Sequence, residues 1–408
     1  MSSYPKSLTY YLTRLNNFSR QKYKVQTLAN TTFNPNDLTV IQLPEGLLDL
    51  STFTLQGQVC GLVSGGTTPT ILPPFIEGLI DNIMIEIGGT SFQSGFSWYN
   101  ELFNILRDFQ IFNKRNMRAV LQNETSNGTL PTGSVVAFPG QPFAIYNWLG
   151  FLGSIKVLDT TILPPVKIYI RWASNAVLSV GGTPTSAAYQ INNAYATIDV
   201  LDISDGVYYN LIQSRLNGSP IELGYDNVTT VVGSTGAPTG STRWSTSADC
   251  LQYVVGTVKP NNYLAQTYNT STQLSDYFTR CGSNNALTQS QWFVNGVPYP
   301  SIPSSVTYGD HFVDTVHALG ESQDPTSSTN PLMNTLTTFN NNFFTHVHSF
   351  TYNDDDDGHR LTGLSGRGNQ ILGSWNLTGT GSNVMPIVFL KHKSVLRIGS
   401  GKSVEMVL

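Results

Sequence analysis

Short runs of β-branched, aliphatic and aromatic residues follow one another along most of the chain, and turn residues separate them. Examples are LTVIQLP, STFTLQGQVCGLV, GLIDNIMIEIGG, VKIYIRWA and YATIDVLDI, with Pro-Asn-Asp at 35–37 and Gly-Gly at 88–89 and 181–182 among the breaks. One helical pattern interrupts them, SWYNELFNILRDFQ, whose apolar positions recur at helical spacing and leave Glu101 and Asp108 on its polar side. Many short strands with one inserted helix predict a β-sandwich or jelly roll.

The pattern begins a second time after YYNLIQSRLNGSP, which predicts a duplicated unit. STFTLQGQV is matched by CLQYVVGTV, IMIEIGGTSFQS by QWFVNGVPYPS, and PVKIYIRW by PIVFLKHK, at offsets of 199, 208 and 221 residues. We call these three matched pairs the repeat markers. In addition, HFVDTVHALG follows QWFVNGVPYPS as NELFNILRDF follows IMIEIGGTSFQS. With 408 residues, two domains are also expected from size alone. We therefore predict a first jelly roll at 25–205, a connecting helix at 206–218 and a second jelly roll at 219–408.

The first 24 residues predict an amphipathic arm helix. Its apolar stripe consists of Leu8, Tyr11, Leu12, Leu15 and Phe18. Its basic residues include Arg14, Arg20, Lys22 and Lys24, and no acid precedes Asp37. Such a helix either packs on its own domain or docks on a membrane, a genome or a neighbouring subunit, and its basic side chains are candidates for phosphate contacts.

Charged residues are scarce in this chain, and this scarcity limits the classes of function that the chain can have. Only 12% of the residues are Asp, Glu, Lys or Arg, and the net charge is −4, which argues against a nucleic-acid-binding protein as a whole. Uncharged polar residues cost less to desolvate than ions, so this composition suits surfaces that neighbours will cover. The three cysteines have no metal-ligand spacing, and no secretion signal starts the sequence, so we expect free thiols and synthesis inside a cell.

The motifs that suggest chemistry are each incomplete. GSGKS near the end lacks the first glycine of a phosphate-binding loop, because Leu396 occupies that position, and too few residues follow for a helix. A β-hairpin is predicted there instead. The acidic run from Asp354 to Asp357 lacks the closing glutamate of a calcium loop and is expected to be a surface turn. His346 and His348 share a strand face, but no spacing fixes a third ligand. We predict no catalytic residue, no metal and no cofactor.

Several stretches resemble double jelly-roll major capsid proteins of the adenovirus-like and tailless-phage viral lineage. FNPNDLTVIQLPEGLLDLSTFTLQGQV is similar to the family's opening strands, LIDNIMIEIGGTSFQSGFSWYNELFNIL to its strand, turn and helix, and RWASNAVLSVGG with NNAYATIDVLDIS to the close of a first jelly roll. VNGVPYPSIP, LTGLSGRGNQ and the final hairpin are similar to its later segments.

This resemblance implies an all-β fold of two tandem eight-stranded jelly rolls, with short inserted helices and the N-terminal amphipathic helix. It implies a non-enzymatic capsid protein of a DNA virus that forms homotrimers of pseudo-hexameric outline and tiles an icosahedral virion shell. Its partners would be neighbouring capsomers, minor capsid or penton proteins and, through the arm, an internal membrane or the genome.

A second hypothesis is a carbohydrate-binding or glycoside-processing protein built from tandem β-sandwiches. Trp148, Trp244 and Trp375 would then be exposed and stack on sugar rings. This hypothesis expects a monomer or small oligomer with a ligand groove, whereas capsid assembly expects a trimer that grows into larger particles.

Overall fold

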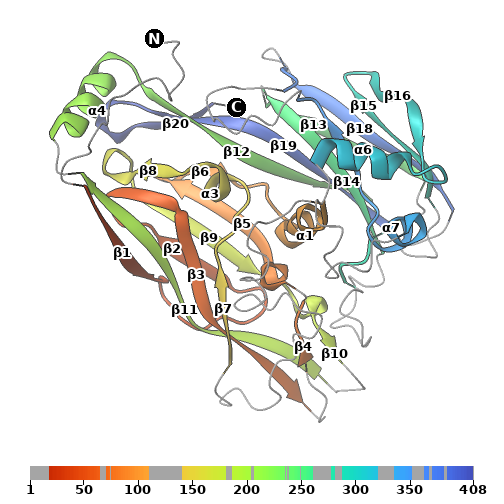
Figure 1. Ribbon diagram of the computed structural model, residues 1–408, viewed down its shortest axis with the longest axis horizontal. Helices are drawn as coiled ribbons and strands as arrows, with labels where there is room; N and C mark the ends of the chain where they lie inside the picture. The colour runs from red at the N-terminus through yellow and green to blue at the C-terminus, as the bar shows by residue number, and fades with distance from the viewer. Residues whose placement is uncertain are drawn as a thin grey trace, which may run out of the picture.

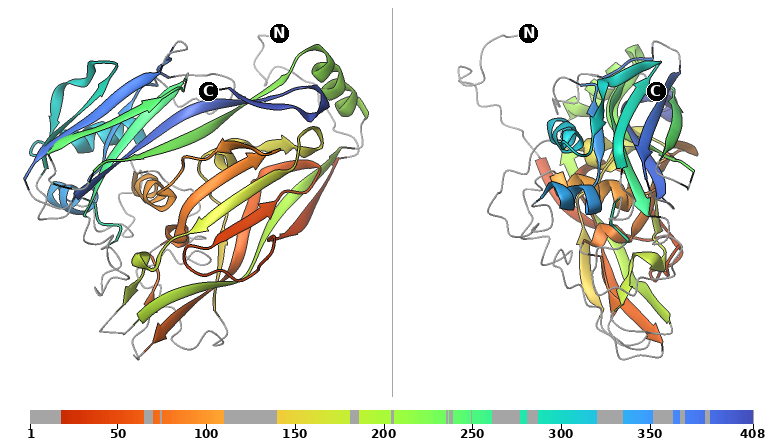
Figure 2. Two further views of the ribbon diagram at one scale, coloured as in Figure 1. Left: turned by 180° about the vertical axis from the view of Figure 1, so that it is seen from behind. Right: turned by 90° about the vertical axis from the view of Figure 1, so that its right-hand side faces the viewer.

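The computed structural model describes residues 18–64, 70–73, 75–109, 140–180, 186–203, 206–234, 236, 239–248, 250–260, 277–280, 287–319, 335–351, 363–366, 370–380 and 384–407. Two β-sandwiches lie side by side, and the chain passes from the first to the second once, through helix α4 (Gly206–Gly218) (Figures 1 and 2). Each sandwich consists of two antiparallel sheets, and each sheet has a main path of four strands. The fold is therefore a double jelly roll, as the sequence predicts.

The first jelly roll precedes helix α4 in the chain. One sheet has the order β1 (Phe18–Gln26), β11 (Ser186–Ile203), β3 (Leu47–Ser64) and β7 (Gln141–Ile145), and β8 (Val157–Asp159) also pairs with β3. The other has the order β2 (Leu38–Gln42), β9 (Val166–Trp172), β5 (Ile80–Ile87) and β6 (Thr90–Gln93). A small ribbon joins β4 (Thr70–Ile71) to β10 (Ser179–Val180).

The second jelly roll repeats this topology after α4. Its first sheet has the order β12 (Ile221–Val232), β19 (Val384–Ile398), β14 (Leu251–Pro260) and β17 (His346–Ser349), and β20 (Val404–Val407) also pairs with β19. Its second sheet has the order β13 (Gly240–Thr246), β18 (Ile371–Gly379), β15 (Leu287–Val294) and β16 (Val297–Ser305).

Strand order tests the three repeat markers directly. Gly57 of β3 and Gly256 of β14 occupy the same place in their sheets, each beside the strand at the sheet's far end, so the first marker is confirmed. The β5–β6 and β15–β16 turns correspond as well. The third marker is wrong, because β9 corresponds to β18 in topology while β19 corresponds to β11. The sequence pattern of a long β-branched strand is the same in either sheet of a sandwich. The proline before each stretch, Pro165 and Pro386, therefore did not show which sheet the strand joins.

Short helices connect the strands. They are α1 (Tyr99–Phe109), α3 (Phe151–Ser154), α4 (Gly206–Gly218), α6 (Asp310–Leu319) and α7 (Leu336–Asn342), with single 3₁₀ turns at Ile76–Leu79, Thr160–Ile162, Asn175–Val177 and Ser400–Lys402. Helix α4 occupies the range predicted for the connecting helix, and α1 and α6 follow β6 and β16 at equivalent places. The apolar stripe of α1 is buried, as its spacing predicts.

Side-chain alternation explains why the strands bury what they bury. In β9, VKIYIRW, Val166, Ile168, Ile170 and Trp172 point into the core while Lys167, Tyr169 and Arg171 do not. Each fully buried aliphatic or aromatic side chain contributes roughly 1.5–3 kcal/mol of hydrophobic stabilisation. The core of the second roll centres on Trp292 and Trp375, whose rings stack with centroids 5.1 Å apart.

The predicted arm helix is wrong over residues 18–24, where the structure has strand β1. Phe18 through Gln26 pair antiparallel with β11, in register from Phe18 with Ile203 to Gln26 with Tyr195. Of the predicted apolar stripe, only Phe18 lies in β1. The hydrogen bonds of this ladder, together with the packing of Val25 on the core, therefore outweigh the helical spacing there. The first jelly roll therefore starts at Phe18 and not at residue 25, and residues 1–17 lie outside the described range.

The C-terminal segment forms the predicted hairpin. Val395 through Ile398 of β19 pair with Val407 through Val404 of β20. Gly401 (φ 69°) and Lys402 (φ 58°) are left-handed in the turn between them, a conformation that glycine adopts readily. GSGKS is thus a turn and does not begin a phosphate-binding helix.

Candidate functional site

Helix α1 lies between the two jelly rolls and carries the most strongly buried charges of the junction (Figure 1). Glu101 and Asp108 project from its polar side, as the sequence predicts, but both are buried against the second roll. Their partners, Lys259 at the end of β14 and Arg280, come from more than 150 positions further along the chain. No local pattern reveals such a pairing, so sequence reasoning missed it.

Two acids and two bases meet at this junction, and Arg107 Nη2 of α1 also lies 3.3 Å from Asp108 Oδ1. Lys259 Nζ lies 2.6 Å from Glu101 Oε2 and also donates to the carbonyl of Tyr277. Arg280 donates to Asp108, lies 3.8 Å from Glu101 Oε1 and donates to Thr345 Oγ1 at 3.0 Å. The side chains of these four charged residues have no solvent exposure. We call Glu101, Asp108, Lys259 and Arg280 the junction cluster.

Burial lowers the pKa of Lys259, and the Glu101 carboxylate opposes that shift. Buried charges such as these need one another, because removing one partner leaves an ion without compensation in a medium of low polarity. The junction cluster therefore favours one relative position of the two rolls. If one roll slid against the other, the four buried charges would lose their partners.

Hydrogen bonds and rings extend the junction along strand β12. Tyr225 Oη donates to the carbonyl of Phe92 at 3.0 Å, and Thr230 Oγ1 donates to the carbonyl of Ser97 at 2.6 Å. The ring of Tyr225 also packs edge-on against Phe151, with centroids 5.0 Å apart. Since Phe92, Ser97 and Phe151 belong to the first roll, the two rolls form one continuous packed unit.

A second buried cluster lies within the second roll, where α6 packs on β17. Ser290 Oγ is 2.7 Å from His311 Nε2 and 2.7 Å from His346 Nδ1, while His346 Nε2 is 3.4 Å from Asp314 Oδ2. With an ionised Asp314, His346 donates from Nε2, so its Nδ1 accepts from the Ser290 hydroxyl, which in turn accepts from His311 Nε2. This orientation keeps both imidazoles neutral.

Burial lowers the pKa of His311 to about 3 and also lowers the pKa of His346. The order serine, histidine, aspartate resembles a hydrolytic triad, but Ser290 and His346 are fully buried and cannot meet a substrate. His348 packs instead against the rings of Tyr299 and Phe350. Within the described part of the chain, no group of three or more His, Cys, Asp or Glu residues is arranged to hold a metal ion.

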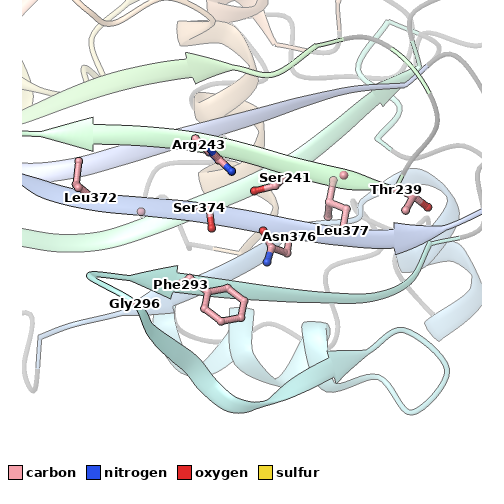
Figure 3. Close-up of a pocket in the computed structure, with 11 residues that line it drawn as sticks. Thr239, Ser241, Arg243, Phe293, Gly296, Leu372, Ser374, Asn376 and Leu377 are labelled. Carbon is pink, nitrogen blue, oxygen red and sulfur yellow. The ribbon is translucent and has the colours of Figure 1, made fainter.

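An open hollow of about 670 Å³ lies on one face of the sheet formed by β13, β18 and β15 (Figure 3). Arg243 and Ser241 come from β13, Ser374 and Asn376 from β18, and Phe293 from β15. Small side chains at the centre make it concave, and exposed Leu372 lies toward one end. The hollow is shallow and mixes one cation with hydroxyl, amide and apolar groups, a combination suited to a neighbouring protein surface.

The arm residues that the sequence singles out divide into two groups. Leu8, Tyr11, Leu12, Arg14 and Leu15 lie outside the described residues, as does the acidic run 354–357. Phe18 is 46% exposed, at the start of β1. Arg20 forms ion pairs with Asp199 (2.5 Å) and Asp49 (3.2 Å), and the Lys24 ammonium lies 3.9 Å above the ring of Tyr195. Contacts within the first roll therefore already engage Arg20 and Lys24.

The tryptophans proposed as sugar platforms are buried, so that expectation is wrong. Trp148 is 7% exposed, Trp244 is 5% and Trp375 is fully buried. Trp148 donates its indole N–H to the carbonyl of Phe53 at 2.9 Å. Trp244 and Trp375 are buried positions of β13 and β18, and Trp148 is buried in the loop that follows β7. Cys60 is a buried free thiol, as expected, and Cys250 is buried as well.

Comparison with solved structures finds the same architecture in viral capsid proteins. The chain is similar to VP54 of PBCV-1, in a crystal structure fitted into a cryo-EM reconstruction of the virophage Sputnik, with a TM-score of 0.66, 13% identity, and coverage of 98% of this chain and 99% of that one. It is similar to the Faustovirus major capsid protein, with a TM-score of 0.65, 8% identity, and coverage of 97% and 93%. A chain of the Sputnik virophage structure matches with a TM-score of 0.55, 13% identity, and coverage of 100% and 93%.

The other comparisons add no relative. No family model and no curated protein sequence matches the chain. At these identities the structural matches establish the double jelly-roll fold. None of the helices in the described ranges is long and apolar enough to cross a membrane.

Proposed function

We propose that this chain is a structural major capsid protein of an icosahedral DNA virus, which trimerises into pseudo-hexameric capsomers that tile the shell. The observation that carries the proposal is a double jelly roll aligned over nearly the full length of both chains with VP54 and with the Faustovirus major capsid protein. The role is architectural and not enzymatic.

The junction supports this role physically. Two rolls of equivalent topology in one protomer give six similar rolls in a trimer, which is the outline that hexagonal tiling needs. Tiling also requires each protomer to behave as one rigid block, and the junction cluster together with the β12 contacts supports that rigidity. With only 12% charged residues, large surfaces are covered by neighbouring copies at low desolvation cost.

The partners follow from the same role. They are two further copies in the trimer, neighbouring capsomers, minor capsid or penton proteins at the vertices and, through residues 1–17, the genome or an internal membrane. The protein would be made in the interior of the host cell and end in the virion. Because Arg20 and Lys24 are engaged in the first roll, Arg14 and Lys22 are the better candidates for phosphate contact.

Electron microscopy of the purified full chain tests the proposal. The expected result is particles of roughly hexagonal outline, with growth into sheets or shells on concentration. Isolated two-lobed monomers at every concentration, together with binding to a glycan array, would contradict the proposal and favour the carbohydrate-binding alternative.

A further inference from the structure

The outer edge of strand β12 is where the second jelly roll receives the first. Strand β12 is the end strand of its sheet, and backbone groups that face away from that sheet bond to the first roll. The Thr230 N–H donates to the carbonyl of Gly95 at 2.9 Å. The Asp226 N–H donates to the Ser154 hydroxyl at 2.9 Å. Together with the contacts of Phe92 and Ser97 described above, these bonds show that residues 92–97, the stretch before α1, cover much of this edge.

Strand β1 is the counterpart of β12 in the first roll, and its outer edge is uncovered. Each of the two strands is the first of its roll and the end strand of the corresponding sheet. Every residue of β1 except Val25 is exposed, including Phe18 (46%) and Tyr23 (47%). Its backbone pairs with β11 on one side, and no other group among the described residues bonds to the backbone on its other side. A long exposed edge strand readily accepts another chain.

The counterpart of residues 92–97 in the second roll is uncovered as well. The stretch at the same distance before α6 as 92–97 is before α1 is 303–308. In and around it, Ile302 is 76% exposed, Tyr308 is 83% and Val313 of α6 is 48%. Strand β1 lies toward the left of Figure 1 and β16 toward the right, at opposite ends of the molecule. One copy therefore cannot bring these two surfaces together.

We propose that the outer edge of β1 is covered by residues 303–308 and α6 of a second copy of this chain. The contact repeats between two copies the way in which the stretch before α1 covers β12 within one copy. Because it joins two different surfaces, it is a head-to-tail contact, and such contacts close into rings when the rotation between copies allows it. The inference rests on the proposed trimer and names the surfaces that meet in it.

The charges of the two surfaces are complementary. Strand β1 carries three basic residues and no acid, whereas residues 297–319 carry Asp310 and Asp314 and neither lysine nor arginine. Lys22 is exposed, and no acid among the described residues pairs with it. Asp310 is exposed at the start of α6. Opposite charges on facing surfaces favour this pairing of copies over a pairing of β1 with β1.

Cysteine cross-linking of the full chain tests which surfaces meet. Lys22→Cys combined with Tyr308→Cys, treated with a short bis-maleimide reagent, should give covalent dimers and trimers on a denaturing gel. Each single variant should stay monomeric on that gel, because a head-to-tail contact keeps two copies of one residue apart. The matched control is Lys22→Cys with Arg243→Cys, which moves the second thiol to the hollow of Figure 3. Trimers in light scattering that link through Arg243, or that do not link, would overturn the inference and leave the proposed function standing.

Charge reversal tests the same contact without a cross-link. Lys22→Glu should weaken association of the trimer at least tenfold in analytical ultracentrifugation, and adding Thr307→Lys should restore it, since the facing charges are then exchanged. Lys156→Glu changes the net charge equally at an exposed site outside both surfaces and should leave the trimer intact. Equal association of Lys22→Glu and the unchanged chain would overturn the inference. An unchanged chain that is monomeric at every concentration would overturn the proposed function and this inference with it.

Discussion

Removing one charge from the junction cluster should destabilise the protein far more than removing one from the surface. In Glu101→Gln, Lys259 loses the carboxylate that lies 2.6 Å from its ammonium, at a site with no solvent exposure. At an effective dielectric constant of about 20, a pair at that distance attracts by about 6 kcal/mol, against a desolvation cost of several kcal/mol per ion. We expect the free energy of unfolding to fall by about 3–5 kcal/mol.

The surface pair of Arg397 and Glu222 is a matched control, because its charged atoms lie 2.9 Å apart but both side chains are more than a third exposed. Glu222→Gln should cost less than about 1 kcal/mol. The assay is urea denaturation followed by tryptophan fluorescence at neutral pH. The double variant Glu101→Met with Lys259→Met should recover most of the loss, since it leaves neither charge unpaired. Equal losses for Glu101→Gln and Glu222→Gln would refute the reasoning.

Three further predictions concern pH, packing and the closing turn. Burial lowers the pKa of His311 to about 3 and of His392 to about 4, and it lowers that of His346. The unfolded chain therefore binds more protons below pH 6.5. The free energy of unfolding should fall by about 1.4 kcal/mol per pH unit for each of His311 and His392 down to about pH 4, and His346 should add to the loss. Urea midpoints that do not change between pH 7 and pH 5 would contradict this. Gly373→Ala would place a Cβ 2.0 Å from the Trp244 ring and should cost at least about 2 kcal/mol in thermal or urea melts, whereas Gly240→Ala, with nothing within 4 Å, should stay within about 0.5 kcal/mol. Lys402→Ala removes an exposed contact to Glu45 at 3.5 Å and should change the free energy of unfolding by less than about 0.5 kcal/mol. Because the loop is a hairpin turn, calorimetry with a nucleotide should give the same result for this variant and for the unchanged protein.

Local patterns predicted much of the fold because jelly-roll strands alternate and their turns need special residues. The β5 and β6 turn with Gly88 and Gly89, and its counterpart with Gly296, have left-handed glycines at matching places. The same patterns misplaced β19, since a strand's sheet depends on partners far along the chain. Similarly, helical spacing over residues 8–18 did not reveal that Phe18 already belongs to a ladder with β11.

The candidate sites depended even more on distant contacts. Glu101 and Asp108 look like ordinary solvated acids of an amphipathic helix, and only the second roll, through Lys259 and Arg280, buries them. The three tryptophans carry no sequence signal that separates a core ring from a sugar platform. Burial of Trp148, Trp244 and Trp375 follows from the facing sheet, which a single strand does not specify.

The mass of the purified full chain, measured by light scattering after gel filtration at two concentrations, tests the central claim most directly. Capsid assembly predicts a stable trimer near three times 44.7 kDa at both concentrations, or particles of megadalton size. A monomer near 44.7 kDa at both concentrations would contradict it.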